Sequence, residues 1–220
     1  MKRTKLKDRN LPVYSRGEEI MNMVTHIVGG AFAIAVLVLM LVKARGGMAI
    51  TGCWIYGITM LITYTMSSVY HGLVPVSGKK VMQVLDHCAI YFLIAGTYTP
   101  IMLVKFIPAY PFIGWGLLGM QWILTALAVT LTATDLKKYK AFSMVCYILM
   151  GWGIIFFLPQ ALEVLGVASF GWLLSGGIAY TIGAILFGIG KKMKWMHSVF
   201  HIFVVLGSVL QFISIYFYML

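Results

Sequence analysis

Charged residues are rare after position 19, and they occur in small clusters separated by long uncharged stretches. They stand at positions 43, 45, 79, 80, 86, 105, 135, 137, 138, 140, 163, 191, 192 and 194. Most of the gaps reach the roughly 20 apolar residues that a helix needs to cross the hydrocarbon core of a bilayer. A segment of this length that satisfies its own backbone hydrogen bonds in lipid is a helix. The chain is therefore predicted to be an all-α integral membrane protein.

Seven stretches fit as membrane spans and predict a seven-transmembrane-helix bundle. They cover residues 20–42, 49–73, 83–104, 110–133, 141–159, 170–190 and 196–219. The hydrophobic share of 61% is well above that of an average soluble domain, in agreement with this reading. Residues 1–19 are expected to form a basic tail that is retained, because no short apolar stretch with a cleavage site precedes the first span. Residues 20–220 are expected to form one membrane domain.

The distribution of Lys and Arg predicts the orientation of the bundle. Fourteen of the 17 basic residues lie before the first span or in the connections after the second, fourth and sixth spans, and three lie on the other side. Connections rich in Lys and Arg stay in the cytoplasm. The N-terminus is thus predicted to be cytoplasmic and the C-terminus outside. The net charge of +11 then reflects topology and anionic lipid head groups, and no nucleic-acid partner is expected.

Four ionisable residues on three spans reach similar depths from the cytoplasmic face. Counted from the nearest lysine at 1.5 Å per residue, His71 lies about 12 Å, Asp86 about 9 Å and His201 about 10 Å along its helix. His197 lies one turn closer to the surface. Ionisable residues inside a membrane span are costly, so their convergence at one depth indicates a functional site.

The pair His197 and His201 can present two imidazoles to one ion, because residues four apart share a helix face. His71 is the candidate for the third ligand. Three histidines with a water in the fourth position describe a catalytic zinc site, in which the ion makes hydroxide available near neutral pH. The alternative is that these histidines are separate packing residues, since an HxxxH spacing also occurs by chance.

Two further residues are candidates for catalysis. Asp86 is the acid expected deepest inside a span, and holding the zinc-bound water would give this carboxylate the partner that it needs. Ser67 lies four residues before His71, on the same face, and could donate a hydrogen bond to a substrate carbonyl or to the oxyanion that follows attack. The alternative for Ser67 is a hydrogen bond back to its own helix.

The other polar residues near this end of the spans have two readings each. His87 adjoins Asp86 but points about 100° away from it on a helix, so a packing or interfacial role is expected. A polar stripe at the start of the first span either supports the ligands or begins the helix; it consists of Glu18, Glu19, Asn22 and His26.

Four motifs carry a resemblance to a known family. They are EEIMNMVTH (18–26), SSVYH (67–71), LDHCAIYFLIAGTYTP (85–100) and HSVFH (197–201). With these motifs in this order, nearly the whole chain resembles the bacterial hemolysin III proteins, which belong with the progestin and adipoQ receptors and more distantly with the alkaline ceramidases. The resemblance implies a seven-helix fold with Zn²⁺ bound near the cytoplasmic face by His71, His197 and His201. It also implies that Asp86 contacts the zinc-bound water and that Ser67 lies nearby.

The expected function is that of a zinc-dependent intramembrane hydrolase acting on a lipid amide or ester, linked to membrane lipid homeostasis. The expected partners are membrane lipids and a lipid substrate inside the bundle, in a bacterial cell membrane, with no oligomeric state favoured. One alternative is a membrane sensor or homeostasis protein with a structural zinc. Another is the cytolytic activity in the family name, although pore formation by a resident membrane protein is physically awkward. A haem carrier is disfavoured because the histidines lie at one depth.

Overall fold

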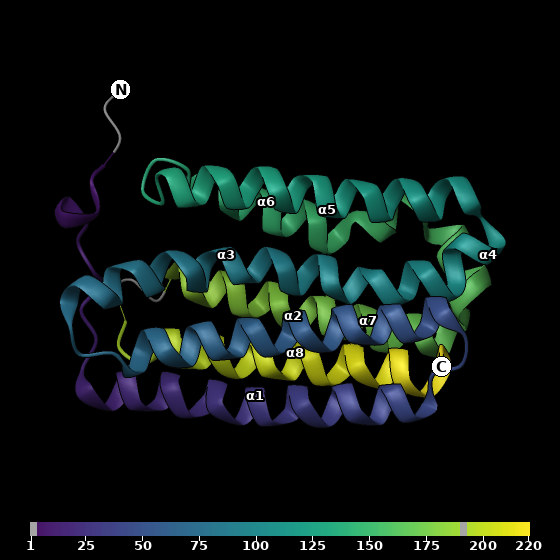
Figure 1. Ribbon diagram of the computed structural model, residues 1–220, viewed down its shortest axis with the longest axis horizontal. Helices are drawn as coiled ribbons and strands as arrows, with labels where there is room; N and C mark the ends of the chain where they lie inside the picture. Colours follow the sequence, from purple (N-terminus) through teal and green to yellow (C-terminus); the bar gives the residue numbers. More distant parts are fainter. Residues whose placement is uncertain (1–3, 190–192) are drawn as a thin grey trace.

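The computed structural model describes residues 4–189 and 193–220, and every regular element within these ranges is helical. The helices run side by side along one direction, and the start of α1 and the end of α8 lie at opposite ends of the bundle (Figure 1). This confirms the all-α prediction. The predicted end of the sixth span, residue 190, lies outside the described residues, as do four of the basic residues used to predict orientation: Lys2, Arg3, Lys191 and Lys192.

Short 3₁₀ and π-helical turns interrupt a series of long α-helices. In chain order the elements are η1 (Leu6–Asp8), α1 (Arg16–Lys43), α2 (Gly47–Gly72), α3 (Val76–Ile101), η2 (Met102–Phe106), α4 (Ile107–Ala109), α5 (Pro111–Thr134), α6 (Lys140–Trp152), η3 (Gly153–Phe157), α7 (Leu158–Ile189) and α8 (Met196–Tyr218). Among the described residues, six helical segments are long and apolar enough to cross a membrane: Arg16–Lys43, Gly47–Gly72, Val76–Ala109, Pro111–Thr134, Lys140–Gly188 and Met196–Tyr218.

The fifth of these segments, Lys140–Gly188, contains both the fifth and the sixth predicted spans. It has 49 residues, which would extend about 74 Å as one straight helix at 1.5 Å per residue. Gly166 breaks the segment, because its φ of 76° and ψ of 158° lie outside the helical region. Such a backbone conformation is open to glycine at little cost. The count of seven spans stays a prediction.

Helix α1 begins four residues before the predicted start of the first span. Ser15 forms a capping box with Glu18: the serine hydroxyl accepts a hydrogen bond from the Glu18 N–H, and the Glu18 carboxylate accepts one from the Ser15 N–H. This exchange satisfies two backbone donors that the first turn leaves free. Glu18 and Glu19 thereby lie in the first turn of α1, where they face the ends of α2 and α8.

Close backbone contact fixes α2 against α3, the two helices that carry Ser67 and Asp86. A Cβ atom on Gly52 of α2 would lie 2.8 Å from the Cα atom of Pro100 on α3. Glycine therefore permits the approach of the two helices, as small residues commonly do in membrane bundles. Extensive packing also joins α1 to α2 and α7 to α8.

The core of the bundle contains tyrosines whose hydroxyl groups are paired. The Tyr64 hydroxyl donates to Ser208 Oγ over 2.7 Å, and Tyr180 Oη lies 2.7 Å from the same serine oxygen. Buried hydroxyls need such partners because an unpaired polar group in the interior is costly. Ser208 therefore joins α2, α7 and α8 below the predicted metal site.

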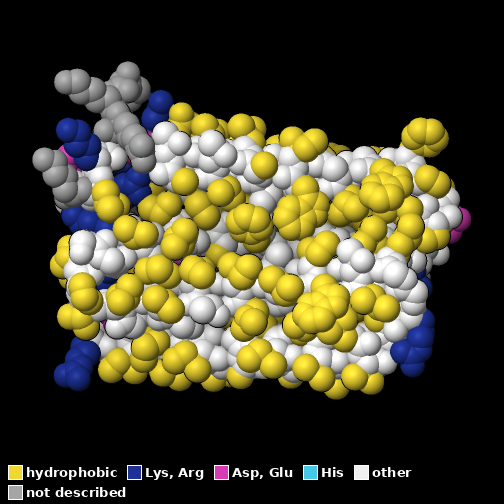
Figure 2. All heavy atoms as spheres, viewed as in Figure 1, with side chains coloured by type: hydrophobic (Ala, Val, Ile, Leu, Met, Phe, Trp, Pro, Cys, Tyr) yellow, Lys and Arg dark blue, Asp and Glu magenta, His cyan; other side chains and the backbone are white. Residues whose placement is uncertain are grey.

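The outer surface agrees with a bilayer environment. Apolar side chains cover the middle of the molecule, and Lys and Arg side chains gather at the two ends (Figure 2). Many large hydrophobic side chains are exposed along the helices, including Ile123 and Phe156 with 70% and 78% of their surface accessible. An apolar band of this extent marks a lipid-facing surface.

Candidate metal centre

The three predicted histidine ligands come together where two helix ends meet. His71 is the last residue but one of α2, and His197 is the second residue of α8, with His201 one turn further along. His71 and His201 are buried, with 3% and 1% of their surface accessible. Helical spacing places His197 and His201 on one face of α8, as the sequence predicted.

The spacing of the imidazole nitrogens fits a small metal ion. His197 Nε2 lies 3.2 Å from His71 Nε2 and 3.1 Å from His201 Nε2. One ligand atom from each of the three residues lies within 4.8 Å of the others. With zinc–nitrogen bonds of about 2.0–2.1 Å, tetrahedral geometry separates two ligating nitrogens by about 3.3 Å. The cluster can therefore hold a metal ion without rearrangement of the helices.

Glu19 orients His71 from the side opposite the cluster. Its Oε2 atom lies 2.6 Å from His71 Nδ1, and its Oε1 atom accepts a hydrogen bond from Lys79 Nζ over 2.6 Å. A carboxylate at Nδ1 favours the tautomer with the proton on that nitrogen, which leaves the Nε2 lone pair free for a metal. Glu19 was expected either to support the ligands or to begin the helix. Its contact with His71 favours support of a candidate ligand.

The start of α8 is held against α1 by two hydrogen bonds. The backbone N–H of Trp195 donates to Glu18 Oε1 over 2.7 Å, and the Ser198 hydroxyl donates to Asn22 Oδ1 over 2.6 Å. Trp195 adopts a left-handed conformation with φ of 69°, which is unfavourable for a large side chain. Glu18 and Asn22 therefore fix the position of α8 on both sides of His197.

Aromatic rings enclose the histidines on the remaining sides. The ring of His26 stacks on that of His201 with centroids 3.8 Å apart, and the ring of Tyr14 stacks on that of His197 with centroids 4.9 Å apart. Tyr14 belongs to the N-terminal tail, and burial raises the pKa of its phenol, so this side chain stays neutral. Apolar ring faces reduce access of water to the cluster.

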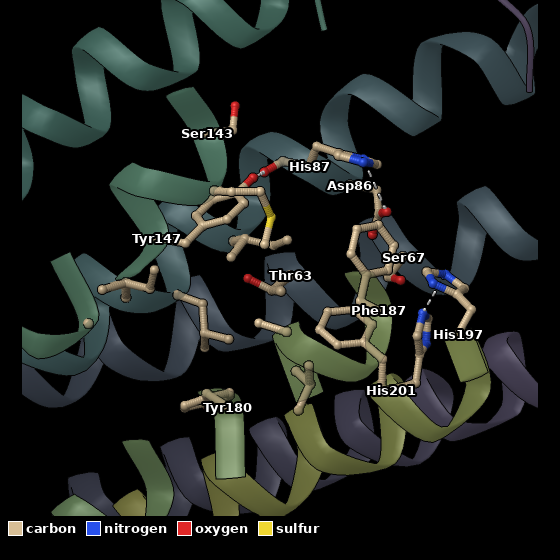
Figure 3. Close-up of a pocket in the computed structure, with 18 of the residues that line it drawn as sticks. Thr63, Ser67, Asp86, His87, Ser143, Tyr147, Tyr180, Phe187, His197 and His201 are labelled. Atoms are coloured by element: carbon tan, nitrogen blue, oxygen red, sulfur yellow. Dashed lines mark hydrogen bonds and ion pairs between the residues drawn. The ribbon is translucent and has the colours of Figure 1, made fainter. Parts of the chain in front are cut away.

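A large cavity inside the bundle extends from this cluster. Its volume is about 1080 Å³, and Ser67, Asp86, His197 and His201 contribute to its wall. Figure 3 shows Ser67 and Asp86 on the same side of the cavity as the two histidines. The Ser67 hydroxyl is buried without a hydrogen-bond partner, in contrast to the bond to its own helix that was the alternative. This oxygen is available to a molecule in the cavity.

Asp86 lies in the cavity wall, with its nearest ionic partner beside it in the chain. Its Oδ2 atom is 3.7 Å from His87 Nδ1, and 15% of its side chain is accessible. His87 Nδ1 also contacts its own helix at the Gln83 carbonyl oxygen, 2.8 Å away. His87 thus borders the cavity and packs on its helix, while the histidine cluster of the described residues consists of His71, His197 and His201.

Sequence reasoning missed the contribution of the N-terminal tail. Tyr14 and Arg9 both line the cavity, whereas the sequence predicted only a retained basic tail at these positions. Their position depends on how the tail folds back over the helix ends, and residue spacing carries no signal for that path. The polar stripe at the start of α1 indicated that a residue there could support the ligands. It did not indicate that Glu19, and not one of its neighbours, contacts His71.

Replacing Glu19 by Gln is expected to weaken metal affinity about 10- to 100-fold, the usual effect of losing a carboxylate behind a ligating histidine. Competition with a chelator of known affinity measures this change. Glu163→Gln is the matched control, because Glu163 lies at the other end of the bundle, where it accepts a hydrogen bond from Tyr110. Equal affinities in the two variants would show that Glu19 does not support the ligand.

Fold and site together define a multi-pass helical membrane protein with a three-histidine cluster able to hold a metal ion at one end of its bundle. The family model described as Haemolysin-III related matches residues 14–212. The chain therefore belongs to the haemolysin-III-related family.

Individual relatives agree with this assignment. Hemolysin-3 of Bacillus cereus is 35% identical over 206 residues, which cover 92% of each chain. The Hemolysin-3 homolog of Bacillus subtilis (strain 168) is 35% identical over 204 residues, covering 91% of this chain and 94% of the relative. The human monocyte to macrophage differentiation factor is 25% identical over 175 residues, covering 76% of this chain and 69% of that protein. The protein is a multi-pass bacterial membrane protein.

Proposed function

We propose that this protein is a zinc-dependent hydrolase that cleaves a lipid amide or ester within the membrane and contributes to membrane lipid homeostasis. The observation that carries the proposal is the cavity of about 1080 Å³ that brings His197, His201, Asp86 and the unpartnered Ser67 hydroxyl to one wall inside an apolar bundle. The cluster supplies three histidines, the number of protein ligands common in catalytic zinc sites.

Each side chain has a role that its position supports. A zinc ion held by the three histidines would supply Lewis acidity and lower the pKa of a coordinated water. Asp86 accepts a proton as water attacks the substrate carbonyl, and it returns that proton to the departing amine or alcohol. Ser67 donates a hydrogen bond to the carbonyl oxygen as negative charge develops there. One water is consumed, and a fatty acid and an amine or alcohol leave the site.

The test of this function is the release of free fatty acid from a panel of membrane lipid amides and esters. Purified protein in lipid nanodiscs is expected to release fatty acid in proportion to time and protein amount, as measured by mass spectrometry. Treatment with a chelator should stop the release, and added zinc should restore it, because the reaction depends on the ion. Release that continues unchanged in the chelated protein would contradict a zinc-dependent hydrolase.

A seven-span topology with a cytoplasmic N-terminus belongs to the same proposal. The break at Gly166 supports two spans within the segment Lys140–Gly188. The start of α1 and the end of α8 lie at opposite ends of the bundle, which supports an odd number of crossings (Figure 1). With the basic connections inside, the metal centre would lie near the cytoplasmic leaflet.

Cysteine labelling tests this orientation. A cysteine at Lys138 is expected to be shielded from an impermeant maleimide in intact cells, and one at Val167 should be labelled. Both positions are exposed at helix ends, and the three native cysteines are buried, so background labelling is low. Both sites should react after permeabilisation. Labelling at Lys138 with protection at Val167 in intact cells would reverse the topology.

A further inference from the structure

Arg9 is a buried arginine with two guanidinium nitrogens that lack hydrogen-bond partners. It has 8% of its surface accessible, and its Nε and Nη1 atoms form no hydrogen bond. A buried cation of this kind is costly unless an anion compensates it. The ion pairs among the described residues join other groups: Glu19 with His71 and Lys79, and Asp86 with His87. The guanidinium is therefore positioned for an anion from outside the chain.

The tail holds Arg9 in the wall of the large cavity. At one side of Arg9 the Thr4 N–H donates to Asp135 Oδ2 over 2.8 Å, and at the other side Ser15 caps α1. The Thr4 and Lys138 N–H groups lower the pKa of the Asp135 carboxyl to about 2. The carboxylate that binds the tail therefore stays charged at physiological pH. The tail thus crosses the end of the bundle from α1 to the connection between α5 and α6.

Arg9 and the metal centre open onto the same cavity. Tyr14, five residues after Arg9, stacks on His197, and both Arg9 and His197 line the cavity wall. Lys137, Lys140 and Lys194 line it as well, so four basic side chains border the cavity. The acidic side chains in its wall are Asp8, which is exposed, Glu18, which accepts hydrogen bonds from Ser15 and the Trp195 N–H, and Asp86, which faces His87, so the basic groups outnumber the acidic ones.

The remainder of the cavity is suited to an acyl chain. Apolar side chains from several helices form its wall there, among them Ile94 of α3, Leu173 of α7 and Val204 of α8. The volume of about 1080 Å³ slightly exceeds the roughly 300–1,000 Å³ usual for ligand pockets. The cavity therefore combines a basic end with a long apolar interior, as an amphiphile requires.

We propose that Arg9 binds the phosphate group of an anionic lipid whose acyl chain occupies the apolar part of this cavity. A guanidinium fork matches phosphate oxygens in a bidentate arrangement, and the lysines of the cavity wall add positive charge that favours a doubly negative phosphate. Naming this lipid as the substrate of the metal centre rests on the proposed hydrolase; binding of the lipid does not.

Native mass spectrometry of the full-length protein tests the proposal. The probes are dioctanoyl phosphatidate, dioctanoylglycerol, which has the same chains without the phosphate, and inorganic phosphate. Unaltered protein is expected to bind phosphatidate at least about ten-fold more tightly than dioctanoylglycerol, since hydrogen bonds to charged groups contribute that much. Arg9→Gln should remove this preference. Arg16→Gln is the matched control, because Arg16 is exposed and lies outside the cavity wall.

The outcomes separate the lipid site from the hydrolase. Equal affinities for the two lipids, or a preference that survives in Arg9→Gln, would overturn the site. Displacement of phosphatidate by inorganic phosphate at similar concentration would assign Arg9 to a free phosphate and overturn the lipid. Because bound mass is read directly, the phosphatidate preference can hold in a protein that releases no fatty acid. Thermal melting of Arg9→Gln confirms that the bundle is intact.

Discussion

Replacement of His71, His197 and His201 together by alanine is expected to reduce bound zinc from about one ion per chain to nearly none. His197 Nε2 lies 3.2 Å from His71 Nε2 and 3.1 Å from His201 Nε2, close to the spacing that a tetrahedral ion imposes. His26 then remains beside the site, but one imidazole holds zinc far less well than three. Elemental analysis of purified protein measures the change, and fatty acid release should fall to background with it.

His87→Ala is the matched control for this experiment. It also removes one histidine near the cavity, but His87 lies outside the cluster and bonds to its own helix. This variant is expected to keep about one zinc per chain, as the three-ligand site is intact. Equal zinc content in the triple variant and the unaltered protein would rule out the proposed metal centre. Circular dichroism of both variants shows whether the helices are retained.

Asp86→Asn is expected to retain zinc while lowering fatty acid release about 10²- to 10⁴-fold, the usual contribution of a general base. The substitution keeps the shape of the side chain and leaves the three histidines in place, but an amide cannot accept the proton. His201→Ala should instead lose metal and activity together, because two imidazoles hold zinc far less well than three. Zinc content and initial rate are measured on the same preparation.

Glu163→Gln provides the matching change of carboxylate to amide at the far end of the bundle, and it should leave the rate unchanged. Full activity in Asp86→Asn would remove Asp86 from the mechanism. The unaltered protein could cleave no lipid in the panel, while Asp86→Asn and His201→Ala both change how cells adjust membrane composition. In that case the protein is a membrane sensor and the proposed hydrolase is wrong. The metal would then serve to hold the bundle in a responsive state.

The sequence predicted the helices well because hydrocarbon imposes a simple length rule. Uncharged stretches of about 20 residues can satisfy their backbone in lipid as helices, and α1, α2, α5 and α8 follow the predicted spans closely. The connection between the fifth and sixth spans was harder to place. Helical structure continues through residues 160–169 apart from Gly166, although the sequence there includes Glu163 and was expected to be a connection.

The site could be predicted as far as side chains share a depth and a helix face. His71, His197 and His201 satisfied both conditions, and the structure brings their ring nitrogens together. The contacts of Glu19 and Tyr14 depend on tertiary placement instead. Glu19 reaches His71 across 52 positions of sequence, and Tyr14 reaches His197 because the tail turns back over the bundle. Helical periodicity describes neither approach.

The cluster joins segments that are made at different times. His71 and His197 are separated by 126 positions, which a ribosome takes about 6–25 s to translate. Helix α2 therefore enters the membrane well before α8 exists, and a chain that ends before Met196 carries one ligand of the three. Capture of a metal ion by all three histidines would have to follow the insertion of α8, and it would tie this helix to an early one. Uptake of the ion would then distinguish chains that contain α8 from shorter ones during biogenesis.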